Sequence, residues 1–288
     1  MNRPTGASDR GSRSGLLAGK RLLVTGVVTT DSIAFASAAA AIRSGAEIVL
    51  STLGRDRGLA EAAASQLPAP VAFLEADLTA PEDLAALAEE IRRSWGSLDG
   101  ALHAVAFAPR DALAGDFLDT DFDAVTRAFH ASTHSYASLA RLVVDLAPSG
   151  GGAIVGLDFD ARGAWPVYNW MGVCKAGLEA VNRYVARDLG GRRIRANLVA
   201  AGPLHTRAAG GIPEFERLTS AWDAQSPLPW DPKDAAPVAD TVCFLLSDWS
   251  RMITGEIVHV DGGYHAMAAP LRGADRVSVD APLVRSPG

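Results

Sequence analysis

The chain has 288 residues, of which 48% are hydrophobic, and a formal net charge of −6. Its apolar content is enough for one large core, and its acidic balance argues against a nucleic-acid-binding surface. No apolar run reaches the roughly 18 residues of a membrane span, and the polar first 15 residues do not resemble a signal peptide, so we expect no membrane partner and a cytoplasmic location.

Strands and helices are predicted to alternate along the chain. Residues 1–16 are polar and rich in Gly, Ser and Arg, which predicts a flexible tail, and residues 268–288 lose periodicity and are expected to form a loosely ordered extension. Apolar runs predict strands over 21–26, 47–52, 70–77, 98–107, 151–159, 193–202 and 256–263. Helical spacing predicts helices that include 32–45, 57–67, 81–96, 168–189 and 237–247.

This alternation predicts the fold class. Most of the strands are too apolar to face water on either side, which indicates a parallel sheet covered by helices on both faces. We therefore expect a single α/β domain over residues 17–267, with a doubly wound, Rossmann-like parallel sheet of about seven strands.

The cysteines and histidines do not indicate a metal site. Cys174 and Cys243 lie in apolar, helical contexts without the spacing of metal ligands, and they are predicted to be buried free thiols. His130 and His134 share a helical face, but histidines in such positions are more often core or surface residues than ligands. We expect no bound metal.

A phenol and an amine lie seven residues apart in the stretch YNWMGVCK, which runs from Tyr168 to Lys175. Seven residues of an α-helix turn through about 700°, so the two side chains share one face, with Met171 near the same stripe. Such a pair can serve one bound molecule from two heights. Taken alone, the spacing is better explained by a surface lysine and a half-buried core tyrosine that happen to align.

The first predicted turn is the place to look for a ligand, because a doubly wound sheet binds its ligand at the carboxyl ends of the strands. This turn reads TGVVTTDSIA and lacks the G-x-G-x-x-G spacing of the usual dinucleotide fingerprint. Gly26 still ends the first strand, and Ser32 and Ile33 open a helix whose free N–H groups can receive a pyrophosphate. Ser32 has a second interpretation as a simple helix N-cap.

The next two strand ends leave the choice of nucleotide open. Asp77 can accept a hydrogen bond from an adenine amino group, or it can cap the helix that follows. No acidic residue ends the second strand, where an NAD site commonly binds the ribose, and Arg55 and Arg57 follow it instead. NADH and NADPH both remain possible.

Seven segments follow one another as in the enoyl-acyl-carrier-protein reductases, a divergent branch of the short-chain dehydrogenase/reductases: TGVVTTDSIAFA, LEADL, LHAVAF, IVGLDFD, YNWMGVCK, RANLVAAGPL and VCFLLSDWSRMITGEIVHVDGG. The resemblance covers residues 17–267 and is greatest to the actinobacterial mycolic-acid type that isoniazid inhibits. Its most specific element is the Y-x-x-M-x-x-x-K spacing, because ordinary short-chain reductases place the lysine four residues after the tyrosine.

The resemblance implies an activity. NADH, with NADPH not excluded, would reduce the carbon–carbon double bond of a trans-2-enoyl thioester carried on acyl-carrier protein or CoA. As negative charge develops on the thioester oxygen, Tyr168 would donate a hydrogen bond to it. Lys175 would hold the nicotinamide ribose, and Phe159 would lie beside the substrate. By analogy the protein would be a homotetramer.

The resemblance also assigns the binding residues. Met171 would face the acyl chain, and the cofactor would be lined by Gly26, Ser32, Ile33, Leu53, Asp77, Leu78, Ala106, Lys175, Leu204 and Thr206. Leu53 stands where close relatives have an aromatic residue, and Ala106 and Ala104 stand where relatives have Gly and Ser. A methyl group at Ala106 would weaken cofactor binding if that position requires a positive φ.

Residues 204–230 follow the sixth predicted strand and are expected to fold over the substrate as a lid. Within them, a short predicted helix presents Phe215, Leu218 and Trp222 at helical spacing, either as lid packing or as the wall of an acyl groove. In the mycolic-acid type this region is longer, so the resemblance implies a preference here for short or medium acyl chains.

Two other functions fit the same scaffold. The first is a carbonyl reductase of specialised metabolism, and the Tyr-to-Lys spacing argues against it. The second is a non-catalytic nucleotide-binding regulator. The presence of Tyr168, Lys175 and Phe159 argues against a regulator, whereas Ala106 favours one.

Overall fold

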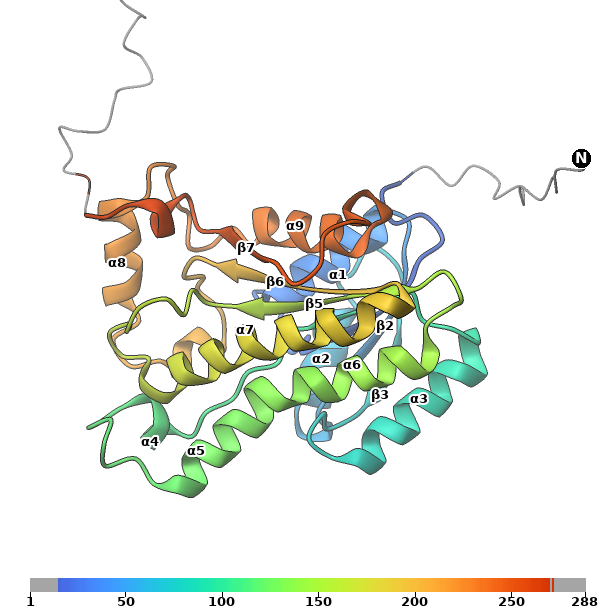
Figure 1. Cartoon of the computed structure of the whole chain (residues 1–288), viewed down its shortest axis with the longest axis horizontal. Helices are drawn as coiled ribbons and strands as arrows, with labels where there is room; N and C mark the ends of the chain where they lie inside the picture. The colour runs from blue at the N-terminus through green and yellow to red at the C-terminus, as the bar shows by residue number, and fades with distance from the viewer. Residues whose placement is uncertain (1–14, 270, 272–288) are drawn as a thin grey trace, which may run out of the picture.

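A seven-stranded parallel sheet forms the centre of the molecule (Figure 1). The computed structural model describes residues 15–269 and 271, so most of the predicted tail (1–16) and extension (268–288) lies outside the described residues. The strand order is β3-β2-β1-β4-β5-β6-β7, and every neighbouring pair is parallel. The strands are β1 Arg21–Thr25, β2 Glu47–Thr52, β3 Ala72–Glu75, β4 Gly100–His103, β5 Gly152–Asp158, β6 Ile194–Ala201 and β7 Ile257–Val260. The predicted fold class is confirmed.

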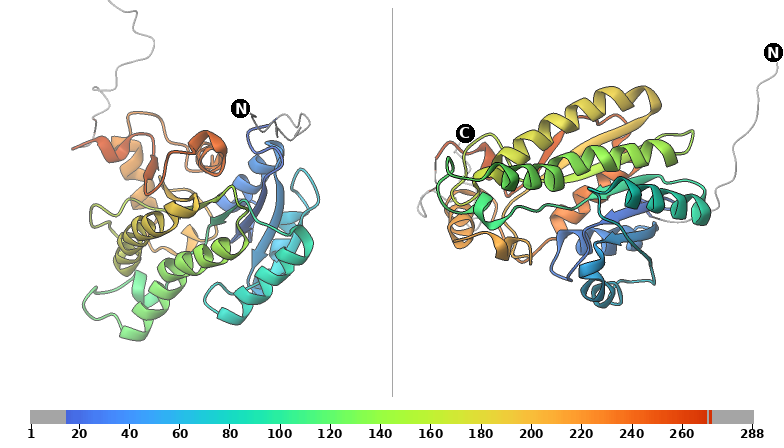
Figure 2. Two further views of the ribbon diagram at one scale, coloured as in Figure 1. Left: turned by 45° about the vertical axis from the view of Figure 1, so that its right-hand side comes forward. Right: turned by 90° about the horizontal axis from the view of Figure 1, so that it is seen from below.

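Helices cover both faces of this sheet. One face is covered by α1 (Ile33–Arg43), α2 (Arg57–Ala64) and α9 (Ala236–Leu246). The other is covered by α3 (Pro81–Trp95), α6 (Ser135–Leu146) and α7 (Asn169–Leu189), which lie side by side (Figure 2). The remaining helices, α4 (Arg110–Leu113), α5 (Phe122–Phe129) and α8 (Glu216–Gln225), lie toward the edge where the strands end (Figure 1).

Alternation along β1 shows why its sequence forms a buried strand. Leu22 and Val24 are fully buried against the layer of α1 and α9, whereas Leu23, between them, is buried against the layer of α3, α6 and α7. Successive side chains of a strand point to opposite faces, so a strand between two helical layers must be apolar at every position. The middle of the strand, Leu22–Val24, meets this requirement, and the polar residues Arg21 and Thr25 stand at its two ends.

The helix after β4 contains a break that the sequence pattern does not indicate. Residues His130–His134 form a π-helical turn that joins α5 to α6, and such turns often occur at functional sites. The rings of His130 and His134 lie 5.3 Å apart, as expected for two residues on one helical face. Both cysteines are buried free thiols, as predicted.

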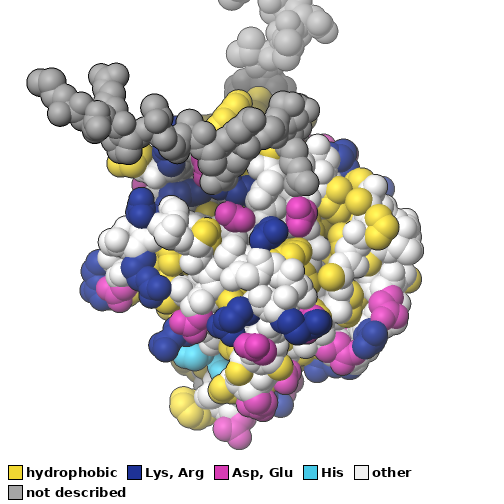
Figure 3. Space-filling view, turned by 90° about the vertical axis from the view of Figure 1, so that its right-hand side faces the viewer, with side chains coloured by type: hydrophobic (Ala, Val, Ile, Leu, Met, Phe, Trp, Pro, Cys, Tyr) yellow, Lys and Arg dark blue, Asp and Glu magenta, His cyan; other side chains and the backbone are white. Residues whose placement is uncertain are grey.

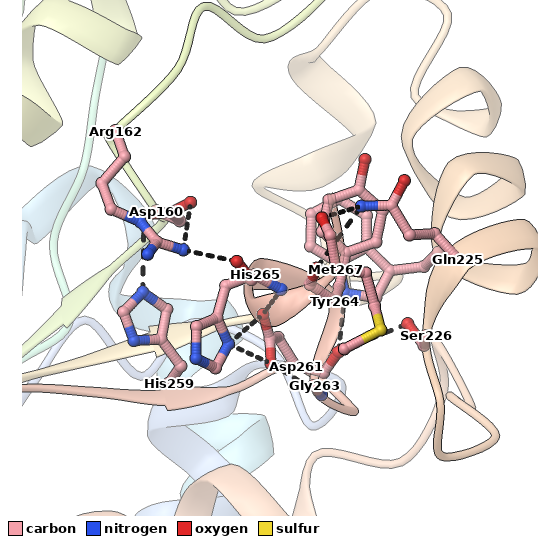
Figure 4. A network of polar contacts seen from close by, with 11 residues as sticks. Asp160, Arg162, Gln225, Ser226, His259, Asp261, Gly263, Tyr264, His265 and Met267 are labelled. Atoms are coloured by element: carbon pink, nitrogen blue, oxygen red, sulfur yellow. Dashed lines mark hydrogen bonds and ion pairs between the residues drawn. The ribbon is translucent and has the colours of Figure 1, made fainter. Parts of the chain in front are cut away.

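A polar network fixes the chain where β7 ends (Figure 4). The buried Asp261 carboxylate accepts hydrogen bonds from the backbone N–H groups of Gly263 and His265, and its Oδ2 lies 3.0 Å from Nδ1 of His265. The rings of His265 and His259 stack at 3.9 Å, and Nε2 of His259 lies 3.4 Å from Asp160. These contacts join the turn after β7 to the loop after β5.

The surface carries charges of both signs. Figure 3 views the side on which the strands begin, and where grey atoms do not cover it, basic and acidic side chains are interspersed. Among the described residues, no helix is long and apolar enough to span a membrane.

A buried hydrogen-bonded pair links the two central helices of one layer. The fully buried Tyr136 on α6 donates its hydroxyl to Oδ1 of Asn182 on α7 at 2.8 Å, and the Asn182 amide donates to the carbonyl of Glu256 at 3.3 Å. The side-chain oxygen of Asn182 therefore depends on the Tyr136 hydroxyl as its hydrogen-bond donor.

We predict that Tyr136→Phe lowers the free energy of unfolding by about 1–3 kcal/mol, because it leaves a buried amide oxygen without its donor. Tyr184→Phe is the matched control, since Tyr184 lies on α7 with 60% of its surface exposed and should change stability by less than about 0.5 kcal/mol. Urea unfolding followed by circular dichroism measures both variants, and equal effects would contradict the prediction.

Candidate active site

A cavity of about 1190 Å³ lies at the carboxyl edge of the sheet. The strand order reverses between β1 and β4, and this reversal opens a crevice where ligands of doubly wound sheets bind. The crevice brings together the three proposed catalytic residues and every residue that the resemblance assigns to the cofactor. Those lining it include Gly26, Ser32, Ile33, Leu53, Asp77, Leu78, Ala106, Phe159, Tyr168, Lys175, Leu204 and Thr206.

Gly26 allows the chain to turn out of β1 into this crevice. Its φ is +81°, and a Cβ built on it would lie 2.2 Å from the carbonyl oxygen of Ala104, at the end of the neighbouring strand. Any other residue would need both a rare backbone conformation and a displacement of β4. The first turn therefore depends on this glycine although it lacks the usual fingerprint.

Ser32 is the N-cap of α1. Its hydroxyl oxygen accepts a hydrogen bond from Phe35 N–H at 3.1 Å and donates to the carbonyl of Thr29 at 2.8 Å. Ile33 and Ala34 lie in the first turn of α1, where the backbone N–H groups have no intrahelical acceptor, and both residues line the cavity. The cap interpretation is confirmed, and the same helix end faces the cavity.

The second and third strands contribute the far end of the cavity. The Asp77 carboxylate accepts hydrogen bonds from both the N–H and the hydroxyl of Thr79, at 2.8 Å and 2.7 Å, so it stabilises its own turn while it lines the cavity. Asp56 lies 3.7 Å from both Arg55 and Arg207, and these three residues also line the cavity. Asp56 and Arg207 are not predicted from the sequence, because an ion pair between distant segments leaves no local pattern.

Tyr168 lies at the start of α7. The helix begins at Asn169, so Tyr168 is its N-cap residue. The predicted helix includes Tyr168 and is wrong at this residue. Val167 and Asn169 on either side of it have φ values of 58° and 36°, which are uncommon for residues other than glycine. The tyrosine ring lies 5.1 Å from the ring of Phe159, which follows β5. Local backbone strain thus accompanies the placement of this phenol.

Lys175 lies in the second turn of α7, with only 5% of its surface exposed. Its Nζ donates a hydrogen bond to the carbonyl of Leu157 on β5 at 2.8 Å. Burial lowers the pKa of the Lys175 ammonium, and the charge of Asp158 opposes this shift. An ammonium carries three donors, so this group has further hydrogen bonds to offer a molecule in the cavity.

Asp158, which is not among the predicted site residues, ends β5 and lines the same cavity. Both of its carboxylate oxygens are buried and lack a hydrogen-bond partner within the described residues. Burial raises the pKa of the Asp158 carboxyl to about 7, although Lys175 acts in the opposite direction. An acidic residue at the end of an apolar strand was the only signal available in the sequence.

The predicted substrate residues fall into two groups. Met171, Phe215 and Leu218 line the cavity. Trp222, also predicted to contact substrate, lies outside the lining: its ring stacks on Tyr264 at 3.9 Å, and its Nε1 donates to the Asp261 carbonyl at 3.1 Å. The start of α8 places Phe215 and Leu218 at the cavity, whereas its last turn places Trp222 against the residues that follow β7.

Ala106 has room in the structure. It lies on the cavity side of the loop after β4 and is exposed there. The described non-glycine residues with positive φ are Val167, Asn169, Arg193 and Glu214, so Ala106 does not occupy a conformation that requires glycine.

Comparison with known proteins gives one consistent result. The family described as enoyl-(acyl carrier protein) reductase matches residues 26–265. The NADH-dependent enoyl-acyl-carrier-protein reductase of Mycolicibacterium smegmatis is 44% identical over 264 residues, which covers 87% of this chain and 97% of the relative. The enzymes of the same name from Mycobacterium avium and Escherichia coli are 41% and 36% identical, cover 87% and 88% of this chain, and are each covered to 97%.

Matches of this extent, at these identities and on this fold, establish the family. The chain belongs to the enoyl-acyl-carrier-protein reductases, within the short-chain dehydrogenase/reductase superfamily.

Proposed function

We propose that this protein reduces the carbon–carbon double bond of trans-2-enoyl thioesters, with NADH as the reductant, in fatty-acid-type acyl-chain synthesis. The observation that supports this most strongly is the placement of Tyr168 and Lys175, seven residues apart, in one cavity at the carboxyl edge of the sheet. The relatives carry the corresponding name. We further propose that residues 17–267 act as one reductase domain, with 204–230 as its lid.

The residues present fit a dinucleotide. Gly26 lets the chain turn at the end of β1, and the first N–H groups of α1, which have no intrahelical partner, lie at the same cavity. Thr206 also lines this cavity and carries a hydroxyl. At the far end, Leu53 and Leu78 provide apolar surface for a flat ring. The cavity, about 1190 Å³, is large enough for such a molecule and part of an acyl thioester.

Each catalytic role follows from residue chemistry. NADH, when bound, supplies the hydride that adds to the β-carbon of the enoyl group. The ammonium of Lys175 would hold the nicotinamide ribose hydroxyls and favour nearby negative charge. The hydroxyl of Tyr168 would donate a hydrogen bond to the thioester oxygen as charge develops there, and a preorganised donor of this kind lowers the barrier by about 3–4 kcal/mol. Phe159, whose ring contacts Tyr168, would shield the reacting atoms from water.

One assay tests the proposal and its alternatives. Oxidation of NADH, and separately of NADPH, is followed by loss of nicotinamide absorbance with a short trans-2-enoyl-CoA, with the same acyl group on acyl-carrier protein, and with a panel of ketones. We expect turnover of the enoyl thioesters with NADH and none of the ketones. Turnover of ketones alone would indicate a carbonyl reductase, and nucleotide binding without turnover would indicate a regulator. The homotetramer and the cytoplasmic location stay predictions.

We predict opposite effects at the two ends of the Tyr–Lys pair. Lys175→Ala should weaken NADH binding roughly tenfold or more, because it removes a charged hydrogen bond made before chemistry. Tyr168→Phe should leave the Kd for NADH within about twofold and lower kcat roughly 10²-fold or more, because the lost bond strengthens only in the transition state. NADH fluorescence titration and steady-state kinetics measure both. Unchanged NADH affinity in Lys175→Ala would refute the assigned role.

The start of α1 allows a test of phosphate binding that does not disturb the helix. Asp is as good an N-cap as Ser, so Ser32→Asp should keep α1 intact while its charge repels the cofactor phosphates, and NADH binding should be lost. Ser32→Asn keeps the cap without the charge and serves as the control, with a smaller loss of affinity. Calorimetric titration of both folded variants decides, and normal binding by Ser32→Asp would count against a phosphate site here.

The wall formed by α8 predicts a limit on acyl-chain length. Phe215 and Leu218 line the cavity, but the stacked rings of Trp222 and Tyr264 lie outside the lining and close that side. Each methylene of the acyl chain contributes up to about 0.8 kcal/mol of binding free energy when the groove buries it. Methylenes beyond the end of the groove contribute little. We therefore expect kcat/KM to rise over short chains and level off at medium length. A steady rise to the longest soluble enoyl-CoA would show that the groove extends further.

A further inference from the structure

The buried carboxyl of Asp158 has no partner that explains its place in the active site. Only 5% of its surface is exposed, and neither carboxylate oxygen has a hydrogen-bond partner within the described residues. A buried polar group without hydrogen bonds costs free energy, and an ionised one costs more. The residue nevertheless ends a central strand and lines the cavity beside Phe159.

The charged group that offsets this cost is Lys175. Its ammonium is equally buried, and it is hydrogen-bonded to the carbonyl of Leu157, the residue before Asp158. The charge of Lys175 lowers the pKa of the Asp158 carboxyl, and the charge of Asp158 raises the pKa of the Lys175 ammonium. No hydrogen bond joins the two groups, so they interact through a poorly solvated interior in which charges are weakly screened.

Other titratable groups near Asp158 do not replace this interaction. Glu179, one turn after Lys175 on α7, and Asp160, on the loop after β5, are acidic and oppose ionisation of Asp158. Tyr168 is neutral, because burial raises the pKa of its hydroxyl and the charge of Asp158 raises it further. The backbone N–H of Phe159 also lowers the pKa of the Asp158 carboxyl, although it does not reach hydrogen-bonding geometry. Among the charged groups of the described residues that act on Asp158, Lys175 is the cation.

We propose that Asp158 is a positioning residue that acts through Lys175: its carboxylate stabilises the buried ammonium and so keeps it charged for the nicotinamide ribose. This inference rests on the proposed function, because it takes Lys175 to be the residue that holds the cofactor. Without the carboxylate, the thiol of Cys174, a weaker influence than Asp158, would be left to oppose the effect of burial on the pKa of the ammonium, and Lys175 would lose its proton at a lower pH. NADH would then bind poorly in alkaline solution.

Asp158→Asn tests this directly, because asparagine has the shape of the protonated acid. At pH 6, below the pKa of about 7, the wild-type carboxyl is itself protonated in the cofactor-free protein, so the variant and the wild type should bind NADH within about threefold. At pH 9, we expect the variant to bind NADH roughly tenfold or more weakly, with the alkaline limb of its binding curve moved about one pH unit toward acid. NADH fluorescence titration from pH 5.5 to about 9.5 measures this.

Thermal unfolding gives a second readout. The pKa of Asp158 in the folded protein is raised from 3.8 to about 7, so the stabilisation is fully present below about pH 4 and is lost as pH rises to about 7. Asp158→Asn cannot ionise and should not show the loss, so its Tm relative to wild type should increase between about pH 4 and pH 7 and change little above that. This would establish that the carboxyl ionises inside the folded protein.

Asp261→Asn is the control for removing a buried negative charge elsewhere. Asp261 is as buried as Asp158, but its carboxylate accepts hydrogen bonds from Gly263 and His265 (Figure 4) and does not line the cavity. Asp261→Asn should therefore keep the wild-type alkaline limb of the NADH-binding curve. An unchanged limb in Asp158→Asn, or an equal loss of affinity at pH 6 and pH 9, would overturn the inference. If wild type binds NADH but reduces no enoyl thioester, the proposed function fails and not the pairing of these two residues.

Discussion

The parallel sheet must be covered on both faces, and the other features of the molecule follow from this constraint. Strands such as β1 are apolar in their middle residues because Leu22 and Leu23 face two different helical layers. Polar and charged side chains are therefore largely excluded from the middle of the sheet and gather where strands end. The crevice between β1 and β4 opens at that edge, and Gly26, Asp158 and the segment after β6 all line it. Because the helices fill the faces, the chemistry takes place at the edge.

The same constraint explains how much of the fold the sequence predicts. A strand with an apolar middle such as Leu22–Val24 has one stable environment, and seven such strands separated by helical patterns define a doubly wound sheet. Gly26 and Ser32 are also recognisable, because a glycine at a strand end and a serine before a helix each have a local steric or hydrogen-bonding reason. The π-helical turn at His130–His134 has no such local signal, since its residues also fit a continuous helix.

Parts of the site depend on contacts between distant segments, and there the sequence is a poor guide. Helical spacing groups Trp222 with Phe215 and Leu218, yet the place of Trp222 depends on Tyr264 and the Asp261 carbonyl, about forty residues later. The spacing from Tyr168 to Lys175 also predicts one helix, whereas the backbone at Val167 and Asn169 sets the phenol just before it. In both cases tertiary packing overrides a periodic pattern. The burial of Asp158 could not be foreseen for the same reason.

The positive φ angles around Tyr168 have a consequence for how this protein can change. A β-branched residue at φ 58° strains the chain, so replacing Val167 by glycine would relieve that strain, at the cost of greater freedom in the unfolded chain. The relaxed segment would hold the phenol less firmly against Phe159. The same backbone position therefore couples strain in the folded chain to the placement of the phenol against Phe159.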